Sequence, residues 1–79
     1  MLKEPINKSF KCPRCGRVIT KNILNHVITT LPSERNIIGE LDHIVEHFED
    51  CICGYDCQIR GSIFEYPINH YNGNNVRMS

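Results

Sequence analysis

Apolar residues recur at helical spacing between residues 23 and 31 of the chain. The positions i, i+1, i+4, i+5 and i+8 of this stretch lie on one helix face, and they hold Ile23, Leu24, Val27, Ile28 and Leu31. Thr20 can cap such a helix and Pro32 can end it. The pattern therefore predicts a first helix, although the β-branched residues from Val27 to Thr30 would also suit a strand.

A second helical pattern occupies residues 34–50. Ser33 can cap this helix, and at about 100° per residue one stripe would face the core, formed by Ile37, Leu41, Ile44, Val45 and Phe48. Gly39 would cost about 1 kcal/mol inside the helix relative to alanine. The sequence thus predicts a second, acidic helix that ends near Phe48.

The segments around the predicted helices have other patterns. Residues 55–66 alternate as a strand does, and Pro67 ends this segment. Its apolar face holds Tyr55, Cys57, Ile59, Gly61 and Ile63. A tight turn within residues 10–19 could join two short strands. Residues 1–9 are predicted to be an irregular arm, and residues 69–79 a polar tail.

The chain has 79 residues, which is enough for one domain, residues 1–79, with a marginal apolar core. Chains of this size are usually stabilised by disulfides, a metal or a partner chain. The sequence holds five Cys and four His, and an odd number of cysteines cannot pair completely within one chain. It shows no secretory signal and no segment apolar enough to span a bilayer. We therefore expect a cytoplasmic protein, or a nuclear one in a eukaryote, whose cysteines bind metal.

The strongest chemical signal is the run CPRCG at residues 12–16. Two thiolates three residues apart, from Cys12 and Cys15, can hold one tetrahedral zinc ion, and a glycine after the second cysteine allows the positive φ of a tight turn. Cys53-Gly54 repeats the second half of this pattern. These segments resemble the zinc knuckles of zinc-ribbon and related zinc-finger proteins. The resemblance implies a structural Zn²⁺ as cofactor.

A structural zinc site needs four ligands, and the sequence offers more than one choice for the last of them. Cys51 is the first choice because zinc takes thiolate readily, although the spacing Cys51-x-Cys53 is tighter than that of an ordinary knuckle. Cys57 or His47 could replace Cys51. With that alternative left open, the predicted zinc ligands are Cys12, Cys15, Cys51 and Cys53.

The histidines suggest further metal sites. His26 follows Cys15 as the first histidine of a two-Cys, two-His zinc finger would, but Thr30 stands where the second histidine is needed. A surface or core-edge position is the better interpretation of His26. A second metal bound by spare histidines stays open, and the candidates are His26, His43, His47 and His70.

Two patterns raise the question of catalysis. In the inverted zincin motif His-x-x-Glu-His, matched by His43, Glu46 and His47, two helical histidines bind zinc and the glutamate activates water. Such an enzyme also needs a substrate cleft, for which this chain has little room. Cys12 and Cys15 have the spacing of a redox motif, but no buried apolar strand precedes them. We therefore expect a binding protein and not an enzyme.

The net charge is zero, yet the charges are unevenly distributed along the chain. Residues 1–21 hold six lysines and arginines against one acidic residue, whereas residues 34–56 hold seven acidic residues against one arginine. Such asymmetry can mark a nucleic-acid surface beside an acidic one. The basic side chains around the first knuckle could meet phosphates, and the predicted nucleic-acid surface consists of Lys11, Arg14, Arg17 and Lys21.

These patterns predict a small α+β zinc-binding domain, in which two knuckles flank one or two helices and a short C-terminal antiparallel strand or hairpin follows. The first functional hypothesis is a zinc-stabilised binding module that contacts nucleic acid or the transcription apparatus as a regulator. The second is a protein–protein adaptor or inhibitor that uses the acidic helix 34–50, makes no contact with nucleic acid and could form a homodimer. Neither hypothesis involves a membrane.

Overall fold

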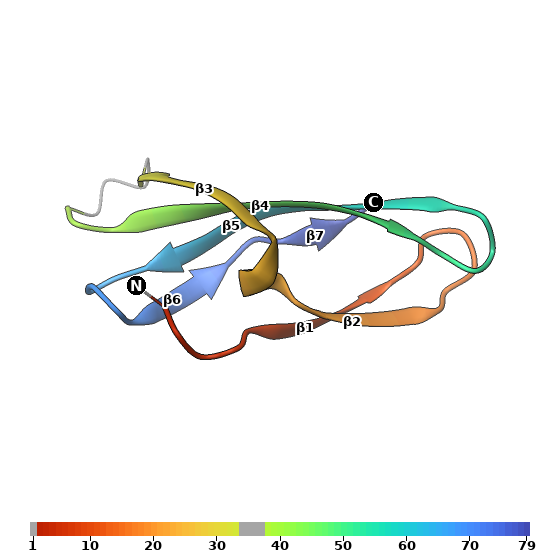
Figure 1. Cartoon of the computed structure of the whole chain (residues 1–79), viewed down its shortest axis with the longest axis horizontal. Coiled ribbons are helices and arrows are strands. Elements are labelled where there is room, and N and C mark those ends of the chain that lie inside the picture. Colours follow the sequence, from red (N-terminus) through yellow and green to blue (C-terminus); the bar gives the residue numbers. More distant parts are fainter. Residues whose placement is uncertain (1, 34–37) are drawn as a thin grey trace.

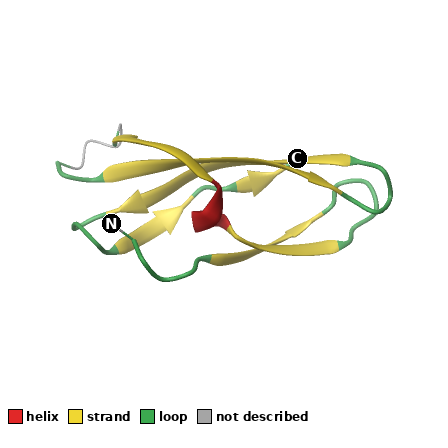
Figure 2. Ribbon diagram, viewed as in Figure 1, coloured by secondary structure: helices red, strands yellow, loops and turns green. Residues whose placement is uncertain are grey.

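The computed structural model describes residues 2–33 and 38–79, and strands dominate both ranges (Figures 1 and 2). A single turn of 3₁₀ helix, η1, occupies Ile23–His26. In chain order the strands are β1 (Asn7–Lys11), β2 (Val18–Asn22), β3 (Val27–Pro32), β4 (Leu41–Asp50), β5 (Asp56–Glu65), β6 (Tyr71–Asn74) and β7 (Arg77–Met78). Strands β1 and β2 form a two-stranded antiparallel sheet. The order β3-β4-β5-β6 forms a second sheet, in which β7 also pairs with β5.

The long hairpin of β4 and β5 is the centre of the larger sheet. The two strands pair without interruption from Leu41 opposite Glu65 to Asp50 opposite Asp56. The strand predicted for residues 55–66 is confirmed as β5, and its apolar face is buried, with Cys57, Ile59 and Ile63 inaccessible to solvent. Period-two alternation identified this strand because one of its faces packs on the core and the other does not.

The predicted α+β fold is wrong, since the described part of the second predicted helix is strand β4. This strand pairs with β3 on one side and with β5 on the other, so its backbone groups bond across the sheet and not along a helix. Alternation places Val45 in the core and leaves Phe48 exposed on the opposite face. Residues 34–37, which hold the first member of the predicted apolar stripe, lie outside the described residues.

The first predicted helix is also wrong. Only η1 forms, and its N-cap is Asn22, whose side chain accepts a hydrogen bond of 3.2 Å from the Leu24 amide. Thr20, the predicted cap, lies within β2. The chain then continues as β3, because its β-branched residues suit a pleated strand and β4 offers a pairing edge.

The β1–β2 hairpin forms a second layer that lies across one face of the larger sheet (Figure 1). Its inward side chain Phe10 joins Val45, Ile59 and Ile63 of the sheet, together with Ile23 and Val76, in one buried cluster. Ile19, from the other strand of the hairpin, packs in a second cluster with the cysteines at one end of the molecule. The overall dimensions are 42 × 22 × 17 Å, so the two layers make a long, thin body.

The turn predicted within residues 10–19 does join two short strands, β1 and β2. The segment predicted as an irregular arm, residues 1–9, includes the start of β1. The predicted polar tail, residues 69–79, contains β6 and β7, which complete the pairing of β5. No helix within the described residues is long and apolar enough to cross a membrane.

Candidate metal centre

Two turns meet at one end of the molecule, the turn between β1 and β2 and the turn between β4 and β5 (Figure 1). They bring together four thiols that each offer one sulfur atom, and these atoms all lie within 4.8 Å of one another: Cys12, Cys15, Cys51 and Cys53. Two of the four, Cys12 and Cys51, are buried, Cys53 is half-buried and Cys15 is exposed. These are the four residues that the sequence predicted as ligands, and they can hold a metal ion.

The first turn is closed by two backbone hydrogen bonds, both of which involve Cys12. The Cys12 amide donates a hydrogen bond of 2.9 Å to the Arg17 carbonyl, and the Gly16 amide donates one of 2.8 Å to the Cys12 carbonyl. Gly16 has a φ of +77°, a conformation that costs a residue with a side chain about 1 kcal/mol or more. The glycine therefore lets the backbone reverse while both sulfurs stay on the inner side of the loop.

The second turn repeats this arrangement with one residue fewer. The Cys51 amide donates to the Tyr55 carbonyl at 3.0 Å, and the Gly54 amide donates to the Cys51 carbonyl at 2.9 Å. Gly54 has a φ of +87°, close to that of its counterpart in the first turn. The shorter loop explains the tight Cys51-x-Cys53 spacing, because both sulfurs can still face the first turn.

Backbone amides in the two turns make the cysteines unequal as acids. A hydrogen bond from the Cys15 amide, opposed by burial and helped by the Arg14 amide, lowers the pKa of Cys12 to about 6. The Cys53 amide acts in the same way on Cys51 and lowers its pKa. At Cys15 the Arg17 amide favours the thiolate, but the neighbouring Cys51 thiol and burial outweigh it and raise the pKa of Cys15 to about 12. Some of the four thiols thus lose a proton readily. All four become thiolates together only when a cation balances their negative charge.

Two of the distances between the sulfurs are close to those expected for a tetrahedral metal site. The Sγ atoms of Cys12 and Cys53 are 3.8 Å apart, and those of Cys15 and Cys51 are 3.5 Å apart. A disulfide bond would require about 2.0 Å, and all five cysteines are free thiols. Four sulfurs placed tetrahedrally at about 2.3 Å from a metal lie about 3.8 Å from one another. The residues therefore fit one tetrahedral ion with four thiolate ligands.

The two alternatives to Cys51 have other roles. Cys57 is fully buried on the inward face of β5, and desolvation raises the pKa of its thiol to about 11, so it packs as an apolar side chain beside the cluster. The His47 ring stacks on His26 with 3.9 Å between ring centroids, and its Nε2 lies 2.8 Å from Glu49 Oε2. The structure thus places Cys51, and neither alternative, among the clustered sulfurs.

Strand β4 also separates the residues of the zincin-like motif. A helix would gather them, but alternation along a strand puts His43 and His47 on one face and Glu46 on the other, where it lies 3.9 Å from Arg60. Among the described residues, no second cluster of three metal-binding groups comes together. His70, the fourth histidine, lines a groove at the opposite end of the molecule.

A buried hydrogen-bonded network at that opposite end was not predicted. The His43 ring lies between two partners, with Nδ1 2.8 Å from Thr30 Oγ1 and Nε2 2.7 Å from Glu65 Oε1, and Glu65 Oε2 accepts a bond of 2.9 Å from the Asn69 amide. Period-two alternation over residues 41–50 would have revealed the network, because it turns His43 toward the same side as the core residues of β5. The helical interpretation hid this signal.

A second buried carboxylate supports the same end. Glu40, which is 2% exposed, accepts a hydrogen bond of 2.6 Å from the Ser33 hydroxyl and one of 3.0 Å from the Asn72 amide group. These contacts join the chain before β4 to the residue that follows β3 on one side and to β6 on the other. Hydrogen bonds between polar side chains thus connect the strands at this end.

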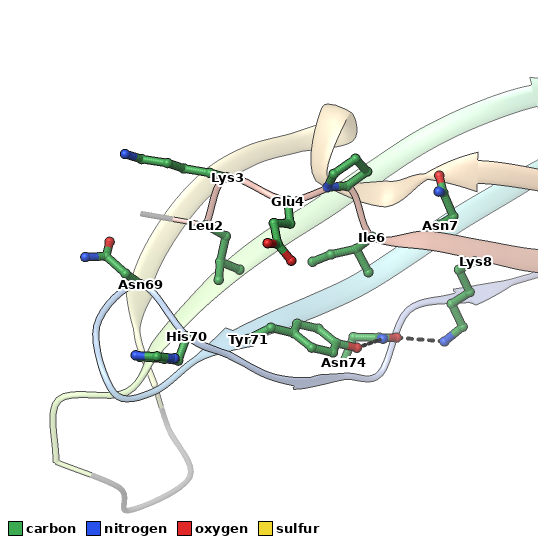
Figure 3. Close-up of a pocket in the computed structure, with 11 residues that line it drawn as sticks. Leu2, Lys3, Glu4, Ile6, Asn7, Lys8, Asn69, His70, Tyr71 and Asn74 are labelled. Atoms are coloured by element: carbon green, nitrogen blue, oxygen red, sulfur yellow. Dashed lines mark hydrogen bonds between the residues drawn. The ribbon is translucent and has the colours of Figure 1, made fainter.

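A half-open groove of about 880 Å³ lies beside this network, between residues 2–8 and residues 69–74 (Figure 3). Leu2, Glu4 and Ile6 point into the groove from the N-terminal segment. Lys8 closes one end, where its Nζ donates to Asn74 Oδ1 at 2.7 Å and to a backbone carbonyl, that of Val76, at 2.6 Å. These bonds tether the hairpin to the sheet, so Lys8 has a structural role.

The predicted basic residues occupy two environments. Lys11, Arg14 and Arg17 are all exposed on the hairpin layer. Lys21 points inward from β2, and its Nζ lies 3.1 Å from Glu49 Oε2. Three of the four residues are therefore open to solvent, whereas the fourth links the hairpin to β4.

No family model, no curated protein and no solved structure matches this chain. The role of the centre therefore has to be inferred from its own geometry and chemistry.

Proposed function

We propose that this chain is a small binding module whose fold is held by a structural Zn²⁺ at Cys12, Cys15, Cys51 and Cys53. The observation that supports zinc is the separation of the sulfurs, 3.5 and 3.8 Å, across two turns that come from different layers. Four thiolates in tetrahedral arrangement are a donor set that zinc occupies in structural sites. When bound, the ion would link the hairpin to the larger sheet and leave no ligand position open for a substrate.

Native mass spectrometry of the purified chain tests the metal. We expect one zinc ion per chain, and removal by a chelator should unfold the protein, because metal-binding free energy in a domain of this size is largely folding free energy. Circular dichroism during the chelator titration should show loss of the β signal together with loss of zinc. A metal-free chain that still unfolds cooperatively on heating would contradict this proposal.

The basic N-terminal residues and the acidic residues of the middle of the chain fall in different layers of the fold. The hairpin layer carries Lys11 on its outward face and exposes Arg14 and Arg17 in its turn. Alternation along β4 and β5 turns a second set of charged side chains away from the hairpin, namely Asp42, Glu46, Asp50, Asp56 and Arg60. Although the net charge is zero, the fold therefore has a basic face and a predominantly acidic face.

We infer that the basic face binds nucleic acid through Lys11, Arg14 and Arg17, and we leave Lys21 out because Glu49 holds it. The formal net charge is zero with neutral cysteines, and a Zn²⁺ ion bound by four thiolates makes it negative, so attraction to phosphates must come from this local surface. Such binding without a catalytic group fits a regulatory role. Contact with the transcription apparatus stays a prediction.

Fluorescence anisotropy with a labelled oligonucleotide tests this binding surface in the zinc-loaded protein. We expect the affinity to fall steeply with salt, and Arg14→Gln with Arg17→Gln should reduce the slope of log K against log[salt] by up to about 2, since each lost phosphate contact contributes about 0.9. The matched control is Arg60→Gln, which removes an exposed positive charge from the opposite face. Equal effects of the two changes, or no binding at low salt, would contradict the proposal.

A further inference from the structure

The outward face of the β1–β2 hairpin carries a continuous set of exposed side chains, all of them polar except Val18. Register pairs Ser9 with Thr20 and Lys11 with Val18, and the two hydroxyl oxygens of the first pair lie 2.9 Å apart. All of the outward side chains before the end of β2 are exposed: Asn7, Ser9, Lys11, Val18 and Thr20. None of them is acidic, so this face combines hydrogen-bonding groups with positive charge.

The dimensions of this ribbon match one groove of a nucleic-acid duplex. Five residues of antiparallel strand span about 17 Å, and two paired strands are about 4.8 Å apart before side chains are added. The major groove of B-form DNA is about 12 Å wide and accepts a two-stranded ribbon. The major groove of A-form RNA is too deep and narrow for side chains to read.

The hairpin is also held in a fixed orientation. Its inward residue Phe10 is buried in the core, and the sulfurs of Cys12 and Cys15 face those of the second turn. Lys8 and Lys21 bond to β6–β7 and to β4 respectively. Because both strands are anchored from behind, the outward face could dock as a preformed surface, at little cost in ordering.

We infer that the β1–β2 hairpin is a ribbon that enters the major groove of B-form DNA, an inference that rests on the proposed nucleic-acid function. Lys11 can donate to the N7 and O6 atoms of guanine, and Val18 can contact the methyl group of thymine. The hydroxyls of Ser9 and Thr20 can bond to either donors or acceptors on the base edges. Arg14 and Arg17, at the tip of the ribbon, neutralise phosphates on the groove wall.

The test uses the zinc-loaded full chain and three labelled probes of one random sequence: duplex DNA, duplex RNA and single-stranded DNA. We expect duplex DNA to bind at least about 10-fold more tightly than the other two, a preference of about 1.4 kcal/mol. Methylation of guanine N7 with dimethyl sulfate, which blocks a major-groove acceptor, should weaken binding of duplex DNA.

A matched pair of variants localises the contact. Thr20→Glu puts an acidic group on the outward face of the ribbon and should reduce DNA affinity at least about 10-fold, because it meets the phosphate-lined groove. Ser62→Glu makes a comparable change on the face of β5 that points away from the hairpin, and it should have little effect. Lys11→Gln is a second ribbon variant with less risk to folding, and thermal unfolding checks all three.

The outcomes separate this inference from the function on which it rests. Salt-sensitive binding that is equally tight for all three probes, or that is insensitive to guanine methylation, overturns the groove inference and leaves the basic-face proposal standing. Equal losses from Thr20→Glu and Ser62→Glu also overturn it. Absence of binding to every probe at low salt overturns both.

Discussion

The two ends of this long molecule are held together by different chemistry. At one end, four cysteines from two turns meet around a centre that can hold a metal ion. At the other end, buried carboxylates and an imidazole make hydrogen bonds that join β3, β4, β5 and β6, through Glu40, His43 and Glu65. Both ends lie beyond the apolar cluster around Ile59 and Ile63. A thin two-layer body of this size cannot cover its ends with apolar side chains. It has metal-binding thiols at one end and hydrogen-bonded polar side chains at the other.

The largest effects are expected from substitutions of cysteines, and they should differ between two cysteines of the same region that have different roles. Cys51→Ala removes one of the four clustered sulfurs and should abolish zinc binding and folding at 25 °C, because structural zinc contributes on the order of 10 kcal/mol. Native mass spectrometry and circular dichroism measure the two losses.

Cys57→Ala is the matched control for that prediction. It removes a buried sulfur that packs beside the metal centre but leaves the four sulfurs of the centre itself. We therefore expect zinc to stay bound and the free energy of unfolding to fall by only about 1–2 kcal/mol. If Cys57→Ala lost zinc while Cys51→Ala kept it, the ligand assignment would be wrong.

A smaller effect is expected at the opposite end. Glu65→Gln leaves His43 without its carboxylate partner at 2.7 Å, and it should lower the free energy of unfolding by about 3 kcal/mol near neutral pH. The metal content should not change. Loss of zinc in this variant would show that the two ends are not independent.

The effect of Glu65→Gln should depend on pH in a defined direction. Burial opposes ionisation of Glu65, but hydrogen bonds from the Asn69 amide and from His43 outweigh it and lower the pKa of this carboxyl below 4.5. A depressed pKa stabilises the fold above the ordinary pKa of glutamate, and this contribution disappears as pH falls through the folded-state value. The difference between wild type and variant in urea unfolding should therefore shrink below about pH 4.

The smallest effects are expected from substitutions of the glycines in the two turns at the metal end. Gly16→Ala and Gly54→Ala each force a side chain into a positive φ, but an added Cβ would meet no atom within 4 Å at either position. We expect each to lower the free energy of unfolding by about 1 kcal/mol, from backbone strain alone, with zinc retained. A much larger loss in thermal unfolding at one turn only would show that the turns are not equivalent.

The cysteine cluster could be predicted because its signal is local. Two cysteines and a following glycine fit within a single turn, and the geometry of such a turn depends on few residues outside it. The sequence favoured Cys51 but left Cys57 and His47 open as alternatives, and only the structure separated these residues from the four clustered sulfurs. The deciding fact was that Cys57 begins the inward face of β5 and is covered by the core.

The helices were predicted wrongly because short apolar patterns can satisfy two periodicities at once. In residues 41–50, Leu41, Ile44, Val45 and Phe48 fit a helical stripe, while His43 and Val45 fit the inward face of a strand. The polar nature of His43 hid the second pattern, because its hydrogen bonds to Thr30 and Glu65 become visible only when β3 and β5 lie beside it. Pairing with these two strands then outweighed the weak helical propensity.

The amino-acid sequence by itself determined the chemistry of the metal end, the two turn glycines and strand β5, since each depends on residues within a few positions of one another. Tertiary structure decided the rest: that residues 27–32 and 41–50 are strands, that Lys21 faces Glu49, and that basic and acidic side chains occupy opposite faces. Strand pairing joins residues far apart in the chain, so neither the register nor the face of a side chain can be known before the partner strand is.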